Sequence, residues 1–373
     1  IRDCLLSRGL GDVYKRQVIG NQNINPYTFT PSMSVNNKAT SWIIDDTYVT
    51  SISSLPALVS QNFTWEKVGT INVGLDVNLF NNRLSGVFEW YQRNTNGMLA
   101  PGVQLPAVVG ASAPYQNTAD MRTRGWELSL NWRDQIGKVG YRIGFNLSDY
   151  KSEIIKYDDN AATKLLSSYY PGQTLGEIWG YVVDGYYTVD DFVDTSSWQL
   201  KEGVTSINGY NVRPGDVKFK NLRDDDTSTN VITSGDNTFD NPGDRKVIGN
   251  TTPRYQYGIN LGMNYAGFDL NVILQGTGKR DYWISNVLTF PMNGDNFVPL
   301  FEGLSDYWMP KDPDNGDWSA VNPNAKYPRI YGNRGNSGSN LRQSDKYLSD
   351  ASYLRIKNIT LSYLSLIHIS EPT

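Results

Sequence analysis

The sequence predicts an all-β protein, and more closely a part of an antiparallel transmembrane β-barrel. Three observations predict this fold. Hydrophobic and polar residues alternate along several segments. Short connections between the segments alternate with long ones, and aromatic residues cluster at the segment ends. The composition agrees, because the 373 residues include 34 Gly, 24 Tyr and 10 Trp but only one Cys and one His. This mix suits a turn-rich β-protein rather than a disulfide scaffold or a His-ligated metalloprotein.

The first predicted hairpin has the clearest alternation. Residues 71–79 read INVGLDVNL, so that every second residue is hydrophobic and those between are Asn, Gly or Asp. The turn residues 81–83 (NNR) follow, and Asn tolerates the backbone angles of a tight turn. Residues 84–91 then alternate again, with Leu, Gly, Phe and Trp on one face and Ser, Val, Glu and Tyr on the other.

Two further hairpins follow the same design, and a weaker strand is expected at 353–363. The paired segments are 126–133 with 141–148, and 255–265 with 268–275. The short links lie at 81–83, 134–140 and 266–267, and the long ones at about 94–125, 150–254 and 278–352. Transmembrane β-barrels alternate in this way between short periplasmic turns and long extracellular loops. Strands of roughly 9–11 residues also suit a tilted crossing of the bilayer.

A soluble β-sandwich also has alternating strands, so the strand pattern alone leaves both folds open. The long connections favour the barrel, because long loops without structure of their own are uncommon in compact domains. We therefore expect a β element inside the connection 150–254, near residues 176–181 and 185–187. The formal net charge of −4 argues against a nucleic-acid binder, which would show a basic face.

The two ends of the chain resemble translated adapter DNA. Residues 12–17 (DVYKRQ) and 364–369 (LSLIHI) can be encoded by DNA strings that are reverse complements of each other. We therefore expect 1–17 and 364–373 to be artefacts of sequencing, and 18–363 to be part of a barrel. Cys4 and His368 both lie in these ends. Without them, Ser-His-Asp and Cys-His catalysis and His/Cys metal sites are excluded, so neither an enzyme nor a cofactor is expected.

Several motifs resemble the SusC/RagA-type TonB-dependent outer-membrane transporters of Bacteroidetes. They occur in family order over nearly all of residues 18–363. Among them are TWEK at 64–67, FNNRLSG at 80–86, GWEL at 125–128, WGY at 179–181, GDVKFK at 215–220, GFDL at 267–270 and DASYLRIKNITL at 350–361.

The resemblance implies a barrel of about 22 strands with an N-terminal plug, of which this chain holds only a part. It implies localisation in the cell outer membrane, in contact with lipid. It also implies energy-coupled import, driven by the TonB-ExbB-ExbD complex, of oligosaccharides or peptides. A SusD-like lipoprotein would act as the lid. A passive outer-membrane porin and a soluble glycan-binding β-protein remain the alternatives.

Two sets of residues are candidate binding sites. Asp224, Asp225 and Asp226 lie where the resemblance places an Asp-rich loop like a calcium site. Their consecutive spacing without Gly favours a solvated acidic loop, so no metal is expected. Aromatic side chains could instead stack on sugar rings in an extracellular loop. The candidates for this role are Tyr169, Tyr170, Tyr186 and Tyr187.

Other polar residues favour structural roles. Trp179 and Tyr181 are expected to pack within their loop, and Asp158-Asp159 and Asp190-Asp191 to lie in surface turns. The polar faces of the strands carry further charges, which are expected to form ion pairs inside the barrel or against the plug. These are Glu89, Glu127, Arg133 and Arg142.

Sequencing the genomic DNA outward from codons 18–363 tests the interpretation of the ends. We expect the codons for 1–17 and 364–373 to be absent, an upstream frame encoding a plug, and a neighbouring gene for a SusD-like lipoprotein. Genuine coding of both ends, with no plug before them, would contradict this and favour the porin or the soluble protein.

Overall fold

The computed structural model describes residues 15–19, 30–31, 33, 35–36, 43–44, 47–48, 52–53, 56–60, 64–223, 230–285, 301–331 and 338–364. The chain divides into two compact units. The sheet unit comprises Ile1–Leu175, Arg254–Gly276 and Leu354–Thr373. The loop unit comprises Gly176–Pro253 and Thr277–Tyr353.

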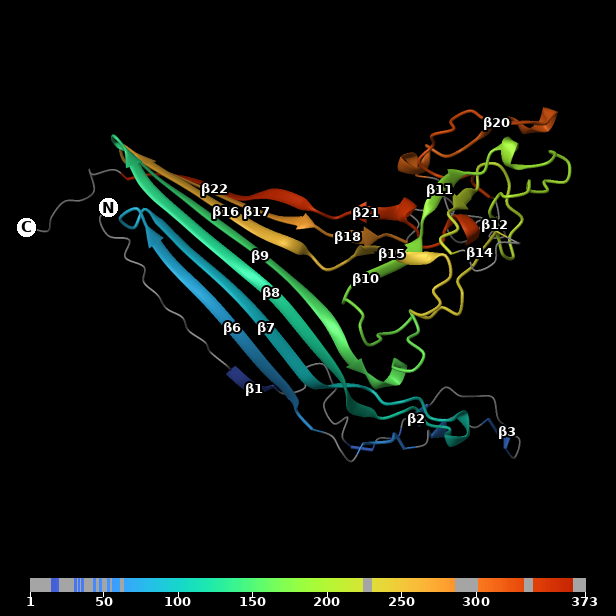
Figure 1. The fold of residues 1–373 in the computed structure, drawn as a ribbon, viewed down its shortest axis with the longest axis horizontal. Helices are drawn as coiled ribbons and strands as arrows, with labels where there is room; N and C mark the ends of the chain where they lie inside the picture. Colours follow the sequence, from blue (N-terminus) through green and yellow to red (C-terminus); the bar gives the residue numbers. More distant parts are fainter. Residues whose placement is uncertain are drawn as a thin grey trace, which may run out of the picture. The chain divides into compact units, whose positions relative to one another are not determined.

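The sheet unit is built on an eight-stranded sheet with the order β1-β6-β7-β8-β9-β16-β17-β22 (Figure 1). Its strands are β1 (Lys15–Ile19), β6 (Glu66–Leu79), β7 (Leu84–Pro101), β8 (Tyr115–Ile136), β9 (Val139–Tyr157), β16 (Arg254–Tyr265), β17 (Phe268–Lys279) and β22 (Tyr353–Tyr363). From β1 to β16, each strand pairs antiparallel with the next in the sheet. The predicted all-β class and the three predicted hairpins are confirmed.

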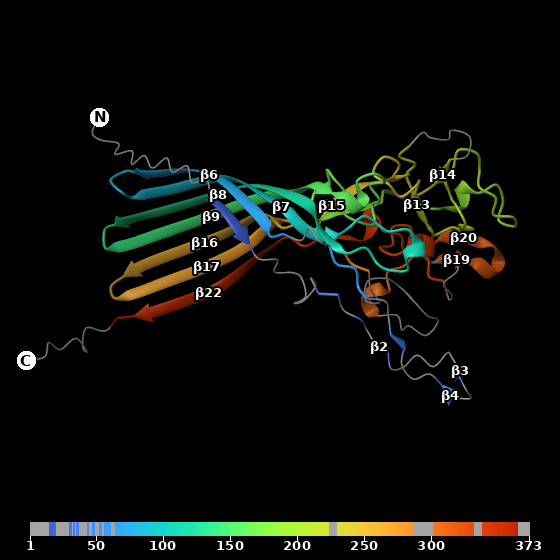
Figure 2. The same cartoon turned by 90° about the horizontal axis from the view of Figure 1, so that it is seen from below.

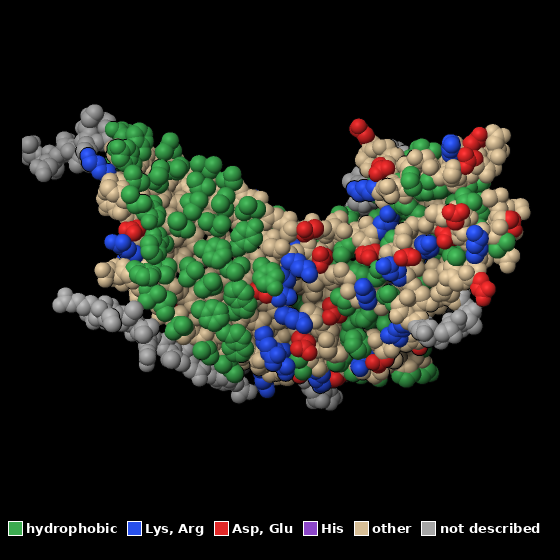
Figure 3. All heavy atoms as spheres, turned by 45° about the horizontal axis from the view of Figure 1, so that its top comes forward, with side chains coloured by type: hydrophobic (Ala, Val, Ile, Leu, Met, Phe, Trp, Pro, Cys, Tyr) green, Lys and Arg blue, Asp and Glu red, His purple; other side chains and the backbone are tan. Residues whose placement is uncertain are grey.

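The register places the hydrophobic residues of neighbouring strands opposite one another. Leu75 lies opposite Phe88, and Phe88 lies opposite Leu128. Leu128 in turn lies opposite Leu147, and Leu147 opposite Tyr257. Since side chains alternate between faces, this register puts the predicted apolar positions of β6, β7, β8, β9 and β16 on the same face. Figure 3 shows the result as a continuous hydrophobic area over the strands.

Tight turns join the strands of each hairpin at one end of the sheet (Figure 2). In the β6–β7 turn, the Arg83 N–H donates to the carbonyl of Phe80 at 3.2 Å. Asn81 and Asn82 take left-handed φ angles of 55° and 64°, which Asn adopts more readily than most residues. Gly267 takes a φ of 86° in the β16–β17 turn, where its missing Cβ avoids strain. The short links are thus genuine hairpin turns.

Strands β6 to β9 are longer than the predicted 9–11 residues, because the ladder continues where the alternation ends, whereas β22 has 11 residues. β6, β7, β8 and β9 have 14, 18, 22 and 19 residues. The expected link 134–140 contracts to the two residues between β8 and β9, and the expected loop 94–125 contracts to 102–114. Directly beyond the predicted segments polar residues pair with polar ones, as Arg93 does with Thr123 and Asn94 with Arg122. Backbone hydrogen bonds need no hydrophobic contrast, so a pattern of hydrophobicity does not detect them.

The apolar face ends at a row of tryptophans. Trp90 lies opposite Trp126, and the next row on that face holds Gln92 opposite Arg124. The Arg124 Nε–H donates to the Gln92 Oε1 at 2.8 Å. Amphipathic indoles followed by charged groups are typical of the boundary between lipid and water. The strands therefore continue beyond this boundary.

An ion pair fixes the start of β16 after the long connection from β9. The guanidinium of Arg254 donates through Nε and Nη2 to the two carboxylate oxygens of Asp149, which is 7% exposed. Such paired, parallel hydrogen bonds define the orientation of both side chains. The backbone N–H of Tyr255 also donates to Asp149 at 3.4 Å. The strand therefore re-enters the sheet at a defined residue.

Two-stranded ribbons and short helical turns make up the loop unit. Its strands are β10 (Glu177–Tyr181), β11 (Val183–Tyr186), β12 (Ser206–Ile207), β13 (Val217–Phe219), β14 (Val231–Ile232), β15 (Arg245–Asn250), β18 (Asp281–Trp283), β19 (Pro310–Asp312), β20 (Asp317–Ala320) and β21 (Leu348–Asp350). The pairs are β10–β15, β11–β13, β12–β14, β18–β21 and β19–β20, and only β12–β14 is parallel. The β element expected near 176–181 is β10.

Short 3-10 turns and small ribbons complete both units. The turns are η1 (Ala107–Val109), η2 (Asp158–Asn160), η3 (Val189–Asp191), η4 (Glu302–Leu304), η5 (Pro313–Asn315) and η6 (Asp345–Tyr347). The small strands are β2 (Val35–Asn36), β3 (Ile43–Ile44), β4 (Thr47–Tyr48) and β5 (Ile52–Ser53). No helix in the described part of the chain has the length and hydrophobicity needed to cross a membrane.

The loop unit has a hydrophobic core of its own. Its main cluster consists of Tyr181, Tyr187, Phe192, Ile207, Val212, Val217, Phe219 and Ile232. Tyr187, Val217, Phe219 and Ile232 are fully buried. This core gives a segment with few regular elements a defined structure, and it can therefore hold side chains in place for binding.

The register predicts opposite effects of charge on the two faces of one strand. We expect Leu130→Arg, on the apolar face, to destabilise the protein in lipid by roughly 2–4 kcal/mol. The adjacent Ser129→Arg, on the polar face, serves as the matched control and should cost much less. Urea unfolding of the protein in lipid vesicles measures both. Equal losses would show that this face does not meet lipid.

Candidate ligand-binding site

A cavity of about 420 Å³ in the loop unit is the strongest candidate for a binding site. This volume lies within the roughly 300–1,000 Å³ that is usual for small-molecule sites. Two stretches far apart in the sequence form its walls, one around β11 and η3 and the other around the β19–β20 hairpin. The lining residues are Tyr186, Thr188, Val189, Asp190, Trp308, Trp318, Ser319, Ala320 and Pro323.

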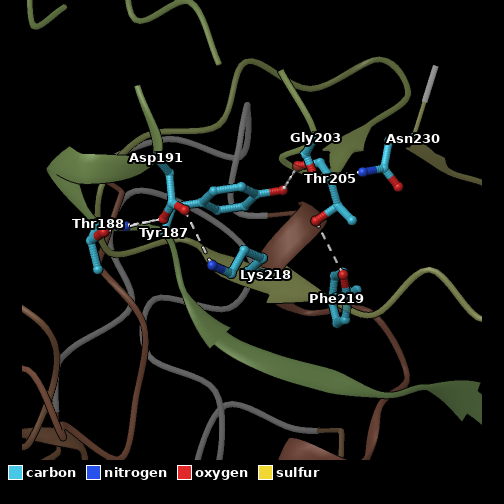
Figure 4. A network of polar contacts seen from close by, with 8 residues as sticks. All are labelled: Tyr187, Thr188, Asp191, Gly203, Thr205, Lys218, Phe219 and Asn230. Carbon is cyan, nitrogen blue, oxygen red and sulfur yellow. Dashed lines mark hydrogen bonds and ion pairs between the residues drawn. The ribbon is translucent and has the colours of Figure 1, made fainter. Parts of the chain in front are cut away.

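The first wall is held by a capping box around η3 (Figure 4). The backbone N–H and the hydroxyl of Thr188 donate to Asp191 Oδ2 at 2.7 and 3.2 Å. The other oxygen of Asp191 forms an ion pair with Lys218 Nζ at 3.2 Å. Capping of this kind satisfies the backbone groups at the start of a helical turn. It leaves the adjacent Asp190 exposed at the cavity.

The same network connects the wall to the core. The Tyr187 hydroxyl donates to the carbonyl of Thr205 at 2.6 Å, and the Thr205 hydroxyl donates to the carbonyl of Phe219 at 3.2 Å (Figure 4). Burial raises the pKa of Tyr187 to about 12, so the phenol stays protonated and remains a donor. The backbone beside the cavity is thus tied to β13.

Tyr186 contributes an aromatic surface whose position is also defined. Its hydroxyl donates to the carbonyl of Ala325 at 2.9 Å. The Lys346 Nζ lies 4.5 Å from the centre of its ring, within the range of a cation–π contact. Burial lowers the pKa of Lys346 to about 8, although the charges of Asp345 and Asp306 oppose the shift.

Trp318 and Trp308 supply the second wall. The ring of Trp318 meets that of Trp198 edge to face at 5.1 Å, and the Arg329 Cζ lies 5.0 Å from the Trp318 centre. Ser319 donates through its N–H and its hydroxyl to Asp317 Oδ1, which fixes this end of β20. Trp308 is 2% exposed, and it packs so closely on Gly215 that a Cβ there would lie 2.3 Å from the indole.

A buried carboxylate supports the second wall from behind. Asp216 is fully buried and accepts hydrogen bonds from the Tyr331 hydroxyl at 2.6 Å, the Asn340 amide at 2.9 Å and the Arg213 N–H at 2.8 Å. Burial raises the pKa of Asp216, and the hydrogen bonds and the charge of Arg329 oppose that shift. Asp216 therefore joins three separate segments of the loop unit.

The structure places the four predicted tyrosines in different surroundings. Tyr186 lines the cavity, as a ligand-contacting residue would. Tyr169 is 50% exposed and meets Tyr157 edge to face at 5.9 Å. Tyr170 and Tyr187 are 1% and 0% exposed, so neither ring presents a face to a ligand in this conformation. The sequence pattern could not separate these cases, because adjacent tyrosines of a loop have no periodic face.

The acidic candidates for a metal site, Asp224, Asp225 and Asp226, lie outside the described residues. Within the described residues, no group of three or more His, Cys, Asp or Glu side chains is placed to hold a metal ion. The four charged side chains for which ion pairs were expected lie on the polar face of the sheet, where the cross-strand neighbours among them carry like charges. Glu89 lies opposite Glu127, and Arg133 opposite Arg142, which forms an ion pair with Asp269 at 3.7 Å.

Comparison with known proteins gives matches along most of the chain. It is 27% identical over 359 residues to TonB-dependent receptor P3 of Formosa agariphila, and 25% identical over 357 residues to TonB-dependent receptor SusC of Bacteroides thetaiotaomicron. These alignments cover 92% and 93% of this chain but 31% and 30% of the relatives. The chain therefore spans about a third of the length of these relatives. No family model matches it.

Solved structures agree with the sequence relatives. The RagAB peptide importer in its closed-closed state has a TM-score of 0.63 at 22% identity, over 94% of this chain and 34% of that chain. The resemblance to SusC/RagA-type TonB-dependent transporters is confirmed. The sheet is accordingly part of a barrel in the outer membrane, and the relatives are transporters and receptors rather than enzymes. In this chain the cavity belongs to the long connections between strands.

Sequence reasoning missed three residues of the site. Trp308, Trp318 and the supporting Asp216 were not predicted as functional. One available signal was the pair of tryptophans in the stretch 308–324, which is rich in Pro, Asp and Asn and would otherwise be an ordinary polar loop. Asp216 lies in the motif GDVKFK, which suggested the family but gave no indication of its role.

Removing the Asp216 carboxylate should loosen the site. In Asp216→Ala, buried donors lose their acceptor at a cost of roughly 1–3 kcal/mol each. We expect hydrogen–deuterium exchange in the peptide 213–219 to accelerate at least tenfold. The control is Asp184→Ala, whose exposed carboxylate is 3.9 Å from Lys220 and should matter little. Equal effects of the two changes would contradict the role of Asp216.

The stability of the folded structure around Asp216 has an expected pH dependence. Because the pKa of Asp216 is raised in the folded state, the folded protein binds more protons than the unfolded one between its ordinary and its raised value. Its contribution to stability is therefore greatest at low pH and falls as the pH rises through the raised pKa. Asp216→Asn should remove this slope.

Proposed function

We propose that this chain forms part of the barrel of a TonB-dependent importer in the outer membrane. The observation that carries the proposal is the sheet itself. One of its faces is continuously apolar, and tight turns alternate with connections long enough to form the loop unit. The named relatives, which include TonB-dependent receptors and a peptide importer, supply the mode of transport.

We further infer that residues 18–363 are one part of a larger barrel. In the sheet that the structure describes, β22 is the last strand in the order, and a strand edge that faces lipid is costly unless another strand pairs with it. Further strands that pair at this edge and at the opposite one would remove that cost. We propose that other strands of the same transporter close the barrel around a plug.

The proposed cargo is an oligosaccharide or a peptide, captured with a SusD-like lipoprotein as the lid. One solved structure that this chain resembles is a peptide importer, and one of its sequence relatives is SusC. Energy would come from the TonB-ExbB-ExbD complex in the inner membrane. A cavity with aromatic and hydroxyl-bearing walls in the long connections is consistent with capture on the outer side.

Uptake measurements test energy coupling. The transporter gene that contains this chain, with its neighbouring lipoprotein gene, is expressed in a Bacteroidetes host that lacks its own transporter for the probe. We expect uptake of labelled oligosaccharides or peptides to fall at least tenfold when TonB is deleted or a protonophore is added. The control is a diffusing solute, whose uptake should not change. Uptake that persists without TonB would favour the passive porin and overturn the proposal.

A further inference from the structure

Positively charged side chains lie on the apolar face of the sheet directly beyond its tryptophan row, and Figure 3 shows Lys and Arg gathered beside the hydrophobic area. Arg124 stands one row further along β8 than Trp126, and Lys151 lies opposite it on β9. Arg122 stands one row beyond Arg124 on the same face, because side chains alternate along a strand. We refer to Arg122, Arg124 and Lys151 as the cationic cluster.

The charged groups of this cluster have hydrogen atoms left to donate. The Arg124 Nε–H donates to Gln92 at 2.8 Å, which orients the guanidinium, while its two Nη groups have no partner among the described residues. The Nε atom of Arg122 is buried without a hydrogen-bond partner in the same part of the chain. Lys151 is exposed and forms no ion pair with a described residue. The cluster can therefore take a ligand that brings several acceptor oxygens.

The acidic side chains beside the cluster do not neutralise it. Asp149, in the tryptophan row, is bound on both carboxylate oxygens by Arg254. Glu153 lies opposite Arg122 but forms no ion pair with it. A positive charge therefore remains at this level of the sheet, and an anion that arrives there meets attraction without an internal competitor.

The depth of the cluster matches the headgroup layer of a bilayer. The tryptophan row marks the boundary between hydrocarbon and headgroups. Rows on one face are two residues apart, which is roughly 7 Å along a strand and about 5 Å along the membrane normal at a tilt of ~40°. Each headgroup layer is roughly 5–8 Å thick. Arg124 and Lys151 therefore lie within this layer, and Arg122 follows at its outer margin.

We propose that the cationic cluster binds the phosphate of a membrane lipid whose headgroup is a dianionic phosphomonoester. The acyl chains lie along the apolar face beside Trp126, and the phosphate reaches Arg124 and Lys151. The two Nη groups of Arg124 donate to two phosphate oxygens, and the ammonium group of Lys151 donates to a third. A zwitterionic headgroup is held less tightly, because its own ammonium group already offsets the phosphate charge. The lipid site is separate from the cargo and from energy coupling.

Native mass spectrometry of the full-length transporter in detergent tests the site. The probes are dioleoyl phosphatidic acid, dioleoyl phosphatidylcholine with the same acyl chains, and inorganic phosphate. We expect phosphatidic acid to bind at least tenfold more tightly than phosphatidylcholine, and an equal concentration of inorganic phosphate not to displace it. Arg124→Gln combined with Lys151→Gln should weaken the binding of phosphatidic acid at least tenfold and change that of phosphatidylcholine less than twofold. TonB is absent, so a failure of uptake remains a separate outcome.

Two further variants keep the test decisive. Arg93→Gln is the matched control, because Arg93 adjoins Gln92 on β7 and so carries the same charge at the same depth on the other face. It should change the binding of phosphatidic acid less than twofold. Lys151→Gln alone replaces an exposed side chain and should weaken binding several-fold, so it substitutes for the double variant if that fails to fold.

Three results would overturn the proposal. The two lipids could bind equally well, the variants of the cluster could leave binding unchanged, or Arg93→Gln could weaken it as much as they do. Displacement of phosphatidic acid by an equal concentration of inorganic phosphate would indicate a site for free phosphate instead of a lipid, and it would overturn the proposal as well.

Discussion

The hydrogen-bonded ladder of the sheet is the constraint on which the rest of the structure depends. In a bilayer, no water is available for backbone N–H and C=O groups, so strands must satisfy each other. The register also decides which side chains meet lipid, because a slip of one residue would exchange the two faces. In this chain the ladder aligns Leu75, Phe88, Leu128 and Leu147 across four strands. The positions of the turns and of the long connections follow from that alignment.

Much of the sheet could be predicted from the sequence, because lipid and lumen impose opposite preferences on alternate residues. The hairpins at 71–91 and 255–275 were found in this way. The ends of the strands were not, since Arg93 and Thr123 pair in a region where both faces are polar. The contrast that reveals a strand disappears there, while the hydrogen bonds that define it persist.

The binding cavity was less predictable, because it depends on contacts between residues distant in the sequence. Tyr186 was recognised by its residue type, but its position beside Trp318 follows from how two connections fold together. Tyr187 belongs to the core although it adjoins Tyr186. An aromatic residue in a loop without periodicity gives the same signal whether it packs inside or faces a ligand. Only the tertiary structure separates the two.

Charge has different roles in the two units. In the sheet unit, Asp149 and Arg254 neutralise each other where a strand begins, so the pair defines an entry point. In the loop unit, the buried Asp216 gathers donors from several segments, while cations rest on aromatic rings. Both arrangements give a polar segment a fixed geometry. A binding surface with a fixed geometry keeps more of its affinity, because its side chains do not have to be ordered when the ligand binds.

The continuation of β7, β8 and β9 past the tryptophan row has a consequence for how such a protein can diversify. Beyond that row the strands form a rim of backbone-paired residues whose first rows are polar, as Gln92 opposite Arg124 and Arg93 opposite Thr123 show. A connection can lengthen, shorten or be exchanged above this rim. Several hydrogen-bonded rows separate it from the lipid-facing part of the sheet, so the register there stays unchanged. Recombination between related genes at the rim would thus yield new recognition surfaces on an unaltered membrane anchor. The rim is therefore a position at which connections can be exchanged, in evolution or by protein engineering, without changing the membrane-spanning part of the strands.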